Sequence, residues 1–304
     1  MERDPKVCVI MSTYNGEKYL REQVDSILSQ KDVELTLCVF DDCSTDSTTE
    51  IIKEYMKENE NVKLTVNEKN KNFTYNFLDA LFSFRENEEY DYYAFADQDD
   101  FWLDTKIISA IKMIEETGEC TMYSSNLKVV DSELKPTGDE MMHKKYKQGH
   151  YDILCKNVVT GCTIVMDKAF KNLATKHYPE NIYLHDYWLA IIAHYCKNAH
   201  FVYDTCPDYI LYRQHGSNLI GVNNKGEVKR MMKKLFTKTD KIKTIQNLIQ
   251  VFGNLYKDEI NEKDRKIIEK SGNVKRLGNR FYLTTHVKTY RPLVYFVKIM
   301  LNKY

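Results

Sequence analysis

Closely spaced cysteine pairs are absent from this chain of 304 residues. Its eight cysteines are scattered, and none forms a Cys-x-x-Cys pair. Several lie in apolar runs such as "VCVIM" and "LCVF", where a free thiol behaves as a small hydrophobic side chain. The pattern argues against a zinc site or a disulfide framework and fits a reducing cytosol.

Long apolar segments are also missing. The start, "MERDPKVCVI", lacks the apolar core of a signal peptide. No run approaches the roughly 20 apolar residues that a membrane-spanning helix needs. With 43% hydrophobic and 29% charged residues, the composition is that of a globular protein, which we expect in the cytoplasm.

An excess of either charge is absent overall, because the formal net charge is zero. The charge is nevertheless uneven. Residues 221–304 hold 20 Lys and Arg against 7 Asp and Glu, a net +13, and the first 220 residues carry −13. The acidic part therefore needs a cationic ligand or partner, and the basic part suits an anionic surface.

Apolar periodicity divides the first part of the chain into alternating units. Strand-like runs cover residues 6–12, 35–42, 62–68 and 91–97, and helix-like segments cover 16–30, 44–58, 73–84 and 104–116. Ser44 and Thr45 are candidate N-caps of the second helix. The alternation predicts an α/β fold, a mostly parallel sheet with helices on both faces and a ligand at the carboxyl ends of the strands.

Glycine-rich phosphate loops are lacking at that edge. Neither the G-x-G-x-x-G pattern nor the P-loop pattern follows the first strand, which ends in "STYNG". The next polar clusters, "DDCSTDS" at 41–47 and "DQDDFW" at 97–102, are rich in carboxylates. Carboxylates repel a phosphate unless a divalent cation lies between, and Mg²⁺ and Mn²⁺ prefer oxygen ligands. The sequence thus predicts a site for a nucleotide diphosphate and its metal.

These segments resemble the family 2 glycosyltransferases of the GT-A fold. The resemblance continues through "VVTGCTIVMDKA", "YLHDYWLAIIAHY" and "ILYRQHGSNLIG" and covers about residues 6 to 221. The wording "DQDDFW", "HDYW" and "YRQHGSN" is most similar to bacterial rhamnosyltransferases of surface-polysaccharide synthesis. The resemblance implies a GT-A catalytic domain at residues 1–221, followed by a basic, mainly helical region at 222–304.

The resemblance also implies a metal site. Asp99 and His215 would bind Mg²⁺ or Mn²⁺, and Asp97 would lie near the ribose or the metal. Asp100 either joins this cluster or caps the next helix. The alternatives are a solvated acidic turn and a solvated loop histidine.

Further residues are assigned to the donor by the same resemblance. Asp41 would accept the imide N–H of the base, with a helix cap by Asp42 or Ser44 as the competing interpretation. Four residues after the first strand would line the base pocket, with Tyr14 stacking on the ring and Glu17 otherwise favouring the helix dipole: Thr13, Tyr14, Asn15 and Glu17.

Three residues are expected near the diphosphate and the sugar. Arg213 would meet the diphosphate, because a guanidinium matches phosphate geometry. The backbone at Gly161 would approach the donor sugar, unless the glycine only permits a turn. Trp188 would contact substrate, with a place in the hydrophobic core as the alternative.

Asp186 is the candidate catalytic base, which takes the proton of the acceptor hydroxyl as the new bond forms. Many relatives have Glu-Asp here, whereas this chain has His185-Asp186. The implied function is inverting transfer of a sugar from a nucleotide diphosphate to a lipid-linked or other saccharide. The expected donor is dTDP-β-L-rhamnose, and a UDP-hexose is the alternative.

The basic region after residue 221 allows two interpretations. It is either a helical appendage packed on the catalytic domain or an interfacial surface that docks on anionic lipid at the inner face of the plasma membrane. Nucleic-acid binding is not expected, since no recognised module is present. A sugar nucleotidyltransferase and a non-catalytic sugar-nucleotide-binding relative remain as alternative functions.

Overall fold

The computed structural model describes residues 3–140, 150–154, 156–215, 240–273 and 277–287. The chain forms two compact units. The first unit comprises residues 1–144, 159–176 and 200–221, and the second comprises 145–158, 177–199 and 222–304. The second unit thus joins two segments from the middle of the chain to residues 222–304, and the predicted domain boundary after residue 221 stays a prediction. Within the described ranges, no helix is long and apolar enough to cross a membrane.

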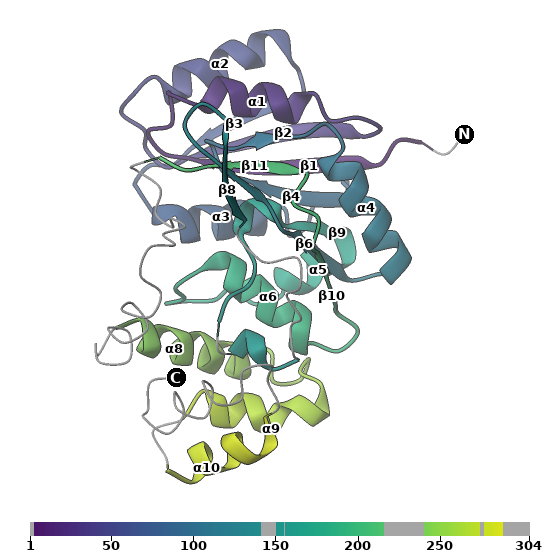
Figure 1. The fold of residues 1–304 in the computed structure, drawn as a ribbon, viewed down its shortest axis with the longest axis vertical. Coiled ribbons are helices and arrows are strands. Elements are labelled where there is room, and N and C mark those ends of the chain that lie inside the picture. Colours follow the sequence, from purple (N-terminus) through teal and green to yellow (C-terminus); the bar gives the residue numbers. More distant parts are fainter. Residues whose placement is uncertain (1–2, 141–149, 155, 216–239, 274–276, 288–304) are drawn as a thin grey trace. The chain divides into compact units, whose positions relative to one another are not determined.

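A seven-stranded sheet forms the centre of the first unit (Figure 1). In the order β10-β6-β9-β4-β1-β2-β3, every pairing is parallel except those of β9 with β4 and β6. Residues 7–11 in β1 are all completely buried, as expected for a parallel strand covered on both faces. The strands are β1 (Lys6–Thr13), β2 (Glu34–Asp41), β3 (Val62–Val66), β4 (Tyr92–Ala96), β6 (Thr121–Ser125), β9 (Val165–Asp167) and β10 (His200–Asp204).

The predicted helices of the first unit are all present. In Figure 1, α1 and α2 lie on one face of the sheet and α3 lies on the other. The predicted N-caps of α2 are wrong, because α2 begins at Thr48 and its N-cap residue is Ser47. Ser44 and Thr45 instead bind Asp41 and Asn15. The helices of this unit are α1 (Leu20–Leu28), α2 (Thr48–Glu58), α3 (Asn72–Ser83), α4 (Lys106–Thr117) and α5 (Lys168–Ala174).

A second, four-stranded sheet brings distant parts of the chain together. Its order is β5-β11-β7-β8, with β5 (Phe101–Trp102), β11 (Ile210–Arg213), β7 (Lys128–Val130) and β8 (Pro136–Glu140). β5 and β11 are antiparallel, with Trp102 opposite Ile210. The residues next to the acidic "DQDD" segment therefore lie beside those that lead to His215.

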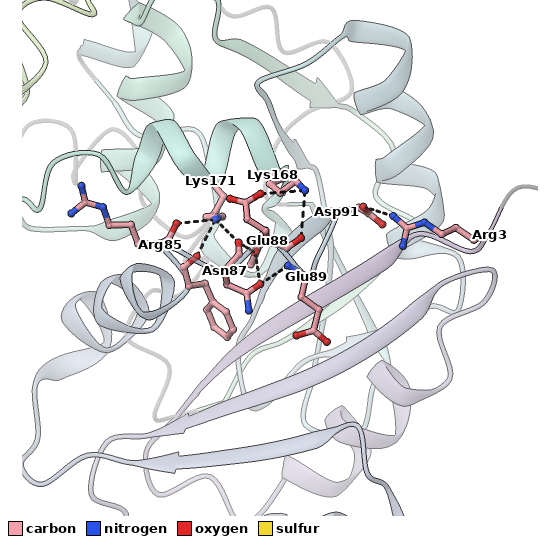
Figure 2. Close-up of polar contacts among 10 residues, drawn as sticks. Arg3, Arg85, Asn87, Glu88, Glu89, Asp91, Lys168 and Lys171 are labelled. Carbon is pink, nitrogen blue, oxygen red and sulfur yellow. Dashed lines mark hydrogen bonds and ion pairs between the residues drawn. The ribbon is translucent and has the colours of Figure 1, made fainter.

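Charged side chains at the amino end of β4 have a structural role (Figure 2). Lys171 of α5 is completely buried and donates to the backbone carbonyls of Phe84, Arg85 and Asn87, just after α3. This ammonium therefore links α5 to the turn that follows α3. Burial lowers the pKa of Lys171.

The second unit is helical in its described part. Its elements are the 3₁₀ turn η1 (Asp152–Leu154) and the helices α6 (His185–Tyr195), α8 (Asp240–Leu255), α9 (Glu262–Ser271) and α10 (Leu277–His286). Trp188 of α6 is completely buried, and its ring lies 6.1 Å from that of Phe252 and 5.8 Å from that of Tyr256. This packing joins α6 to α8 within the second unit, and both interpretations of the region after residue 221 stay predictions. The burial of Trp188 corrects its predicted substrate contact, because it is a core residue.

Candidate active site

The polar segments after β1, β2 and β4 meet at one edge of the large sheet. In the strand register, Thr13 lies opposite Asp41, and Asp41 lies opposite Val66 of β3. On the other side of β1, Met11 lies opposite Ala96, so the chain enters the acidic segment beside the end of β1. The predicted gathering of these segments at the carboxyl edge is confirmed.

The segment after β1 is bonded to the segment after β2. The side-chain oxygen of Asn15 accepts from the Thr45 N–H at 2.8 Å, and the carboxylate of Glu17 accepts from the Ser47 N–H at 2.9 Å. Asn15 and Glu17 therefore hold the 44–48 loop in place, although both are exposed on one side. Their contact with the donor stays a prediction.

Asp41 is completely buried at the end of β2. Its carboxylate accepts from the Thr13 hydroxyl at 2.8 Å, from the Ser44 N–H at 2.8 Å and from the Ser44 hydroxyl at 2.5 Å. An ionised carboxylate has about four acceptor positions, so these three bonds leave one of them unused, and the bond of Asp41 to an imide N–H stays a prediction. Asp42 does not cap α2, because its Oδ1 accepts from the Asn67 side-chain amide and from the Lys71 N–H before α3.

Tyr14 presents an aromatic ring at this edge, with 49% of its surface exposed. The side-chain amide of Gln98, from the middle of the acidic segment, bonds to both backbone groups of Tyr14. The loop that carries Tyr14 is thus joined directly to the segment that carries Asp97 and Asp99. An exposed ring on a fixed backbone is suited to stacking on a nucleobase.

The predicted metal ligands Asp99 and His215 are in contact. His215 Nε2 lies 2.8 Å from Asp99 Oδ2, and the imidazole lies 4.9 Å from the ring of Tyr19. Burial raises the pKa of Asp99, and the bond to His215 opposes this increase. A carboxylate and an imidazole at this separation, both partly exposed, can serve as two ligands of one cation.

Arg213 holds the acidic segment rather than facing solvent. Only 1% of its surface is exposed; its Nε donates to the Asp99 carbonyl at 3.0 Å, and its Nη2 donates to Glu22 at 2.6 Å. The guanidinium also lies over the ring of Tyr19, 4.4 Å from the centroid. These contacts disfavour the predicted bond of Arg213 to a diphosphate.

Asp97, Asp100 and Cys162 form a second acidic group, in which Asp100 and Cys162 are buried. Donor atoms of Asp97, Asp100 and Cys162 lie within 4.8 Å of one another, and Asp100 Oδ2 has no hydrogen-bond partner among the described residues. Burial, reinforced by Asp99 and Asp97, raises the pKa of Asp100 well above its usual value. Asp100 does not cap α4, whose N-cap residue is Thr105.

Lys106 is a buried lysine that interacts electrostatically with this group. It is 1% exposed, its ammonium lies 3.3 Å from the centroid of the Trp102 ring, and the nearby charges of Asp100 and Asp97 favour its protonated form. Burial lowers its pKa to about 7. Sequence reasoning missed Lys106 because it occupies the first position of a helix, where an exposed lysine is ordinary.

An open cavity of about 360 Å³ borders the metal ligands. Its lining joins the three polar segments and consists of Asn15, Gly16, Glu17, Lys18, Tyr19, Asp46, Gln98, Asp99 and His215. A larger cavity of about 470 Å³ lies at the amino end of β4, but Asp91 and Asp167 in its lining are bonded to Lys6 N–H and Phe170 N–H. We therefore assign the site to the carboxyl edge.

The donor set fits a divalent cation. Carboxylate oxygens of Asp97 and Asp99 with the His215 imidazole are ligands that Mn²⁺ and Mg²⁺ accept. A thiol suits softer metals, and burial raises the pKa of Cys162 well above its usual value, so this thiol stays protonated. The assignment of the metal to Asp99 and His215 stays a prediction.

Two predicted site residues remain, Gly161 and Asp186. Gly161 is buried and opens the 3₁₀ turn η2 (Gly161–Thr163), whose next residue is Cys162 of the deeper group. Asp186 belongs to the second unit, where it stands in the first turn of α6 and accepts from the Tyr187 N–H at 2.6 Å. The roles of both residues toward a sugar stay predictions.

Comparison with known sequences decides the family. Residues 8–174 match the model of "Glycosyl transferase family 2". The chain is a family 2 glycosyltransferase. This assignment confirms the predicted family and removes the nucleotidyltransferase alternative.

Relatives of this glycosyltransferase include enzymes with named donors. It is 34% identical over 227 residues to the dTDP-rhamnosyl transferase RfbG of Shigella flexneri, covering 70% of this chain and 74% of that protein. It is 29% identical over 192 residues to the UDP-Glc:alpha-D-GlcNAc-diphosphoundecaprenol beta-1,3-glucosyltransferase WfgD of Escherichia coli, covering 62% and 70%.

Solved structures confirm the predicted GT-A fold of this glycosyltransferase. S. aureus TarS 1-349 in complex with UDP matches with a TM-score of 0.61 at 18% identity, over 97% of this chain and 80% of that one. The mannosyltransferase PcManGT from Pyrobaculum calidifontis, in complex with GDP-Man and Mn²⁺, matches with a TM-score of 0.53 at 15% identity, over 100% and 82%.

Proposed function

We propose that this glycosyltransferase is metal-dependent and inverting, and that it moves L-rhamnose from dTDP-β-L-rhamnose to a lipid-linked saccharide in cell-surface polysaccharide synthesis. The observation that carries the proposal is the Asp99–His215 pair, whose side chains lie 2.8 Å apart. The pair lines a cavity together with residues of the loop that follows β1 (the β1 loop, residues 14–19). This arrangement suits a donor that has a base at one end and a metal-bound diphosphate at the other.

Each donor-binding residue has a distinct part in the proposal. Tyr14 stacks on the base, and the remaining acceptor position of Asp41 takes the imide N–H. Asp99 and His215, with Asp97 beside them, hold the cation, which when bound offsets the charge of the departing diphosphate. The backbone at Gly161 borders the sugar.

The proposed transfer is a single displacement. Asp186 accepts the proton of the acceptor hydroxyl while the acceptor oxygen bonds to the anomeric carbon and the bond from that carbon to the diphosphate oxygen breaks. The sugar passes through an oxocarbenium-like state, as in other glycosyl chemistry. A β-linked donor therefore gives an α-L-rhamnoside.

The nucleotide is the least constrained part of the donor. The identity with the dTDP-rhamnosyl transferase supports dTDP-rhamnose, whereas the relative named for UDP-Glc and the fold likeness to a protein bound to UDP support the alternative, a UDP-hexose. Thymine and uracil share the imide N–H that Asp41 would accept, so this residue does not discriminate between them.

A thermal-shift screen tests the donor. We expect dTDP-β-L-rhamnose with Mg²⁺ or Mn²⁺ to raise the unfolding temperature by several degrees, since a ligand at 100 times its Kd adds about 2.7 kcal/mol. UDP-glucose, UDP-GlcNAc and GDP-mannose, each with and without metal, are the comparison ligands. A larger shift with a UDP-sugar would replace rhamnose by a hexose, and no shift with any of them would contradict the proposed function.

We further propose that the basic C-terminal region contacts anionic lipid at the inner face of the plasma membrane, where a lipid-linked acceptor resides. Its net charge of +13 supports this, and Lys257, Lys263 and Arg265 are exposed in the described part. Changing these three to Glu should reduce sedimentation with phosphatidylglycerol vesicles at low salt by several fold.

The matched control alters the same charge in the first unit. Lys53, Lys57 and Lys112 are exposed on α2 and α4, and their change to Glu should leave vesicle binding close to that of the unaltered protein. Equal loss in both triple variants would indicate attraction by overall charge alone. No vesicle binding by the unaltered chain would reject membrane contact.

A further inference from the structure

Gln98 stands between the two aspartates of the acidic segment and bonds to a different loop. Its Oε1 accepts from the Tyr14 N–H at 2.8 Å, and its Nε2 donates to the Tyr14 carbonyl at 3.1 Å. One amide thereby pairs with both backbone groups of one residue, as a neighbouring strand would. Two hydrogen bonds from one amide fix the orientation of the Tyr14 backbone as well as its position.

Gly16 makes room for this amide. A Cβ at position 16 would lie 2.3 Å from Gln98 Oε1 and 2.5 Å from its Cδ, closer than any real contact. The φ angle of Gly16 is outside the left-handed region, so its backbone does not itself require glycine. Glycine at position 16 therefore leaves free the volume that a Cβ would fill, and the Gln98 amide occupies this volume.

Both residues belong to the cavity that borders the metal ligands. Asp97 and Asp99 flank Gln98 in the chain, and Tyr14 carries the exposed ring of the β1 loop. A displacement of the Gln98 amide would release the Tyr14 backbone from the acidic segment. It would leave the aspartates themselves chemically unchanged.

We infer that Gln98 is a positioning residue that, with the space provided by Gly16, couples the base-binding loop to the metal-binding segment. The inference rests on the proposed function, because it assigns Tyr14 to the base and Asp99 to the metal. It deepens that function by making base binding and metal binding one cooperative event. Binding of the base then strengthens binding of the metal-bound diphosphate, and the reverse.

A double-mutant cycle tests the coupling. Gly16→Ala, Gln98→Ala and the double variant are titrated calorimetrically with dTDP and with UDP, each with and without Mg²⁺. The added methyl in Gly16→Ala meets the end of a flexible side chain, so the amide swings away at little cost to folding. We expect each single variant to weaken nucleotide binding by about tenfold, the loss of one to two hydrogen bonds. The double variant should be no weaker than either one.

Two further variants separate positioning from other roles. Gln98→Met keeps the length of the side chain without its hydrogen bonds, and we expect it to match Gln98→Ala. Gly278→Ala, at a glycine with nothing near its Cβ position, is the matched control and should bind as the unaltered protein does. In the Gly16 and Gln98 variants, Mg²⁺ should improve nucleotide affinity by a smaller factor, which a general loss of stability would not produce.

The outcomes divide clearly. Multiplicative losses in the double variant, or full affinity in Gln98→Met, would overturn the coupling. Loss in Gln98→Ala but not in Gly16→Ala would instead make Gln98 a direct contact of the ligand. If the unaltered protein binds neither dTDP nor UDP, the proposed function fails and the inference with it. If the unaltered protein binds a nucleotide but the free-energy losses of the two single variants add up in the double variant, the inference is rejected and the proposed function stands.

Discussion

Asp99→Ala is expected to abolish the metal dependence of nucleotide binding while the protein stays folded. The substitution removes one of the two proposed metal ligands, whose side chains lie 2.8 Å apart, and it leaves the His215 imidazole as the other. Burial raises the pKa of Asp99, so its charge is costly in the metal-free protein. We therefore expect an unfolding temperature equal to or above that of the unaltered chain.

The measurement is calorimetric titration of dTDP and UDP over a range of Mg²⁺ and Mn²⁺ concentrations. Asp208→Ala, an exposed aspartate of the same unit, provides the same chemical change outside the cavity and should bind normally. His215→Ala should weaken the metal effect in the same direction. An Asp99→Ala protein whose nucleotide affinity still responds to metal as before would disprove the metal assignment.

Asp186→Asn is expected to lower the turnover number by roughly 10²–10⁴, the usual contribution of a general base. The Asn side chain has nearly the same shape, and its oxygen can still accept from the Tyr187 N–H that Asp186 binds at 2.6 Å. Donor binding should therefore survive. This result would separate Asp186 from Asp99, whose loss lowers donor affinity as well.

Transfer to a saccharide acceptor and slow hydrolysis of the donor both report this step, since each needs a proton removed from the attacking hydroxyl. Asp258→Asn, at an exposed position of the second unit, is the matched control. The anomeric configuration of the product is read by NMR. Near-normal turnover in Asp186→Asn, or a product with retained configuration, would refute the role of Asp186.

Much of the first unit could be predicted from local sequence patterns. Apolar runs such as that of residues 6–12 are buried strands, and the helical segments between them lie where their periodicity placed them. The rule that polar loops gather at the carboxyl ends of parallel strands then predicts that Asp41 and the "DQDD" segment lie at the same edge. Resemblance to a family added Asp99 and His215, whose contact the structure shows.

Other residues acquired their roles only from long-range pairing. Arg213 was expected at a diphosphate, yet it is buried against Asp99 because β11 pairs with β5, more than 100 positions earlier. Trp188 looked like a sugar platform beside Asp186, but Phe252 from a distant helix covers it. The sequence around Arg213 does not indicate Asp99 as its partner, and the sequence around Trp188 does not indicate Phe252.

The sequence by itself determined which segments form strands and helices, which face of each is apolar, and which polar residues stand at strand ends. These properties depend on neighbours one to four positions away, which the sequence displays directly. Only the tertiary structure decided the antiparallel β9, the β5–β11 pairing, the clasp of Gln98 on Tyr14 and the division into two units. The reason is physical: a buried polar group must find a partner, and which partner is near depends on how strands far apart in the chain are aligned.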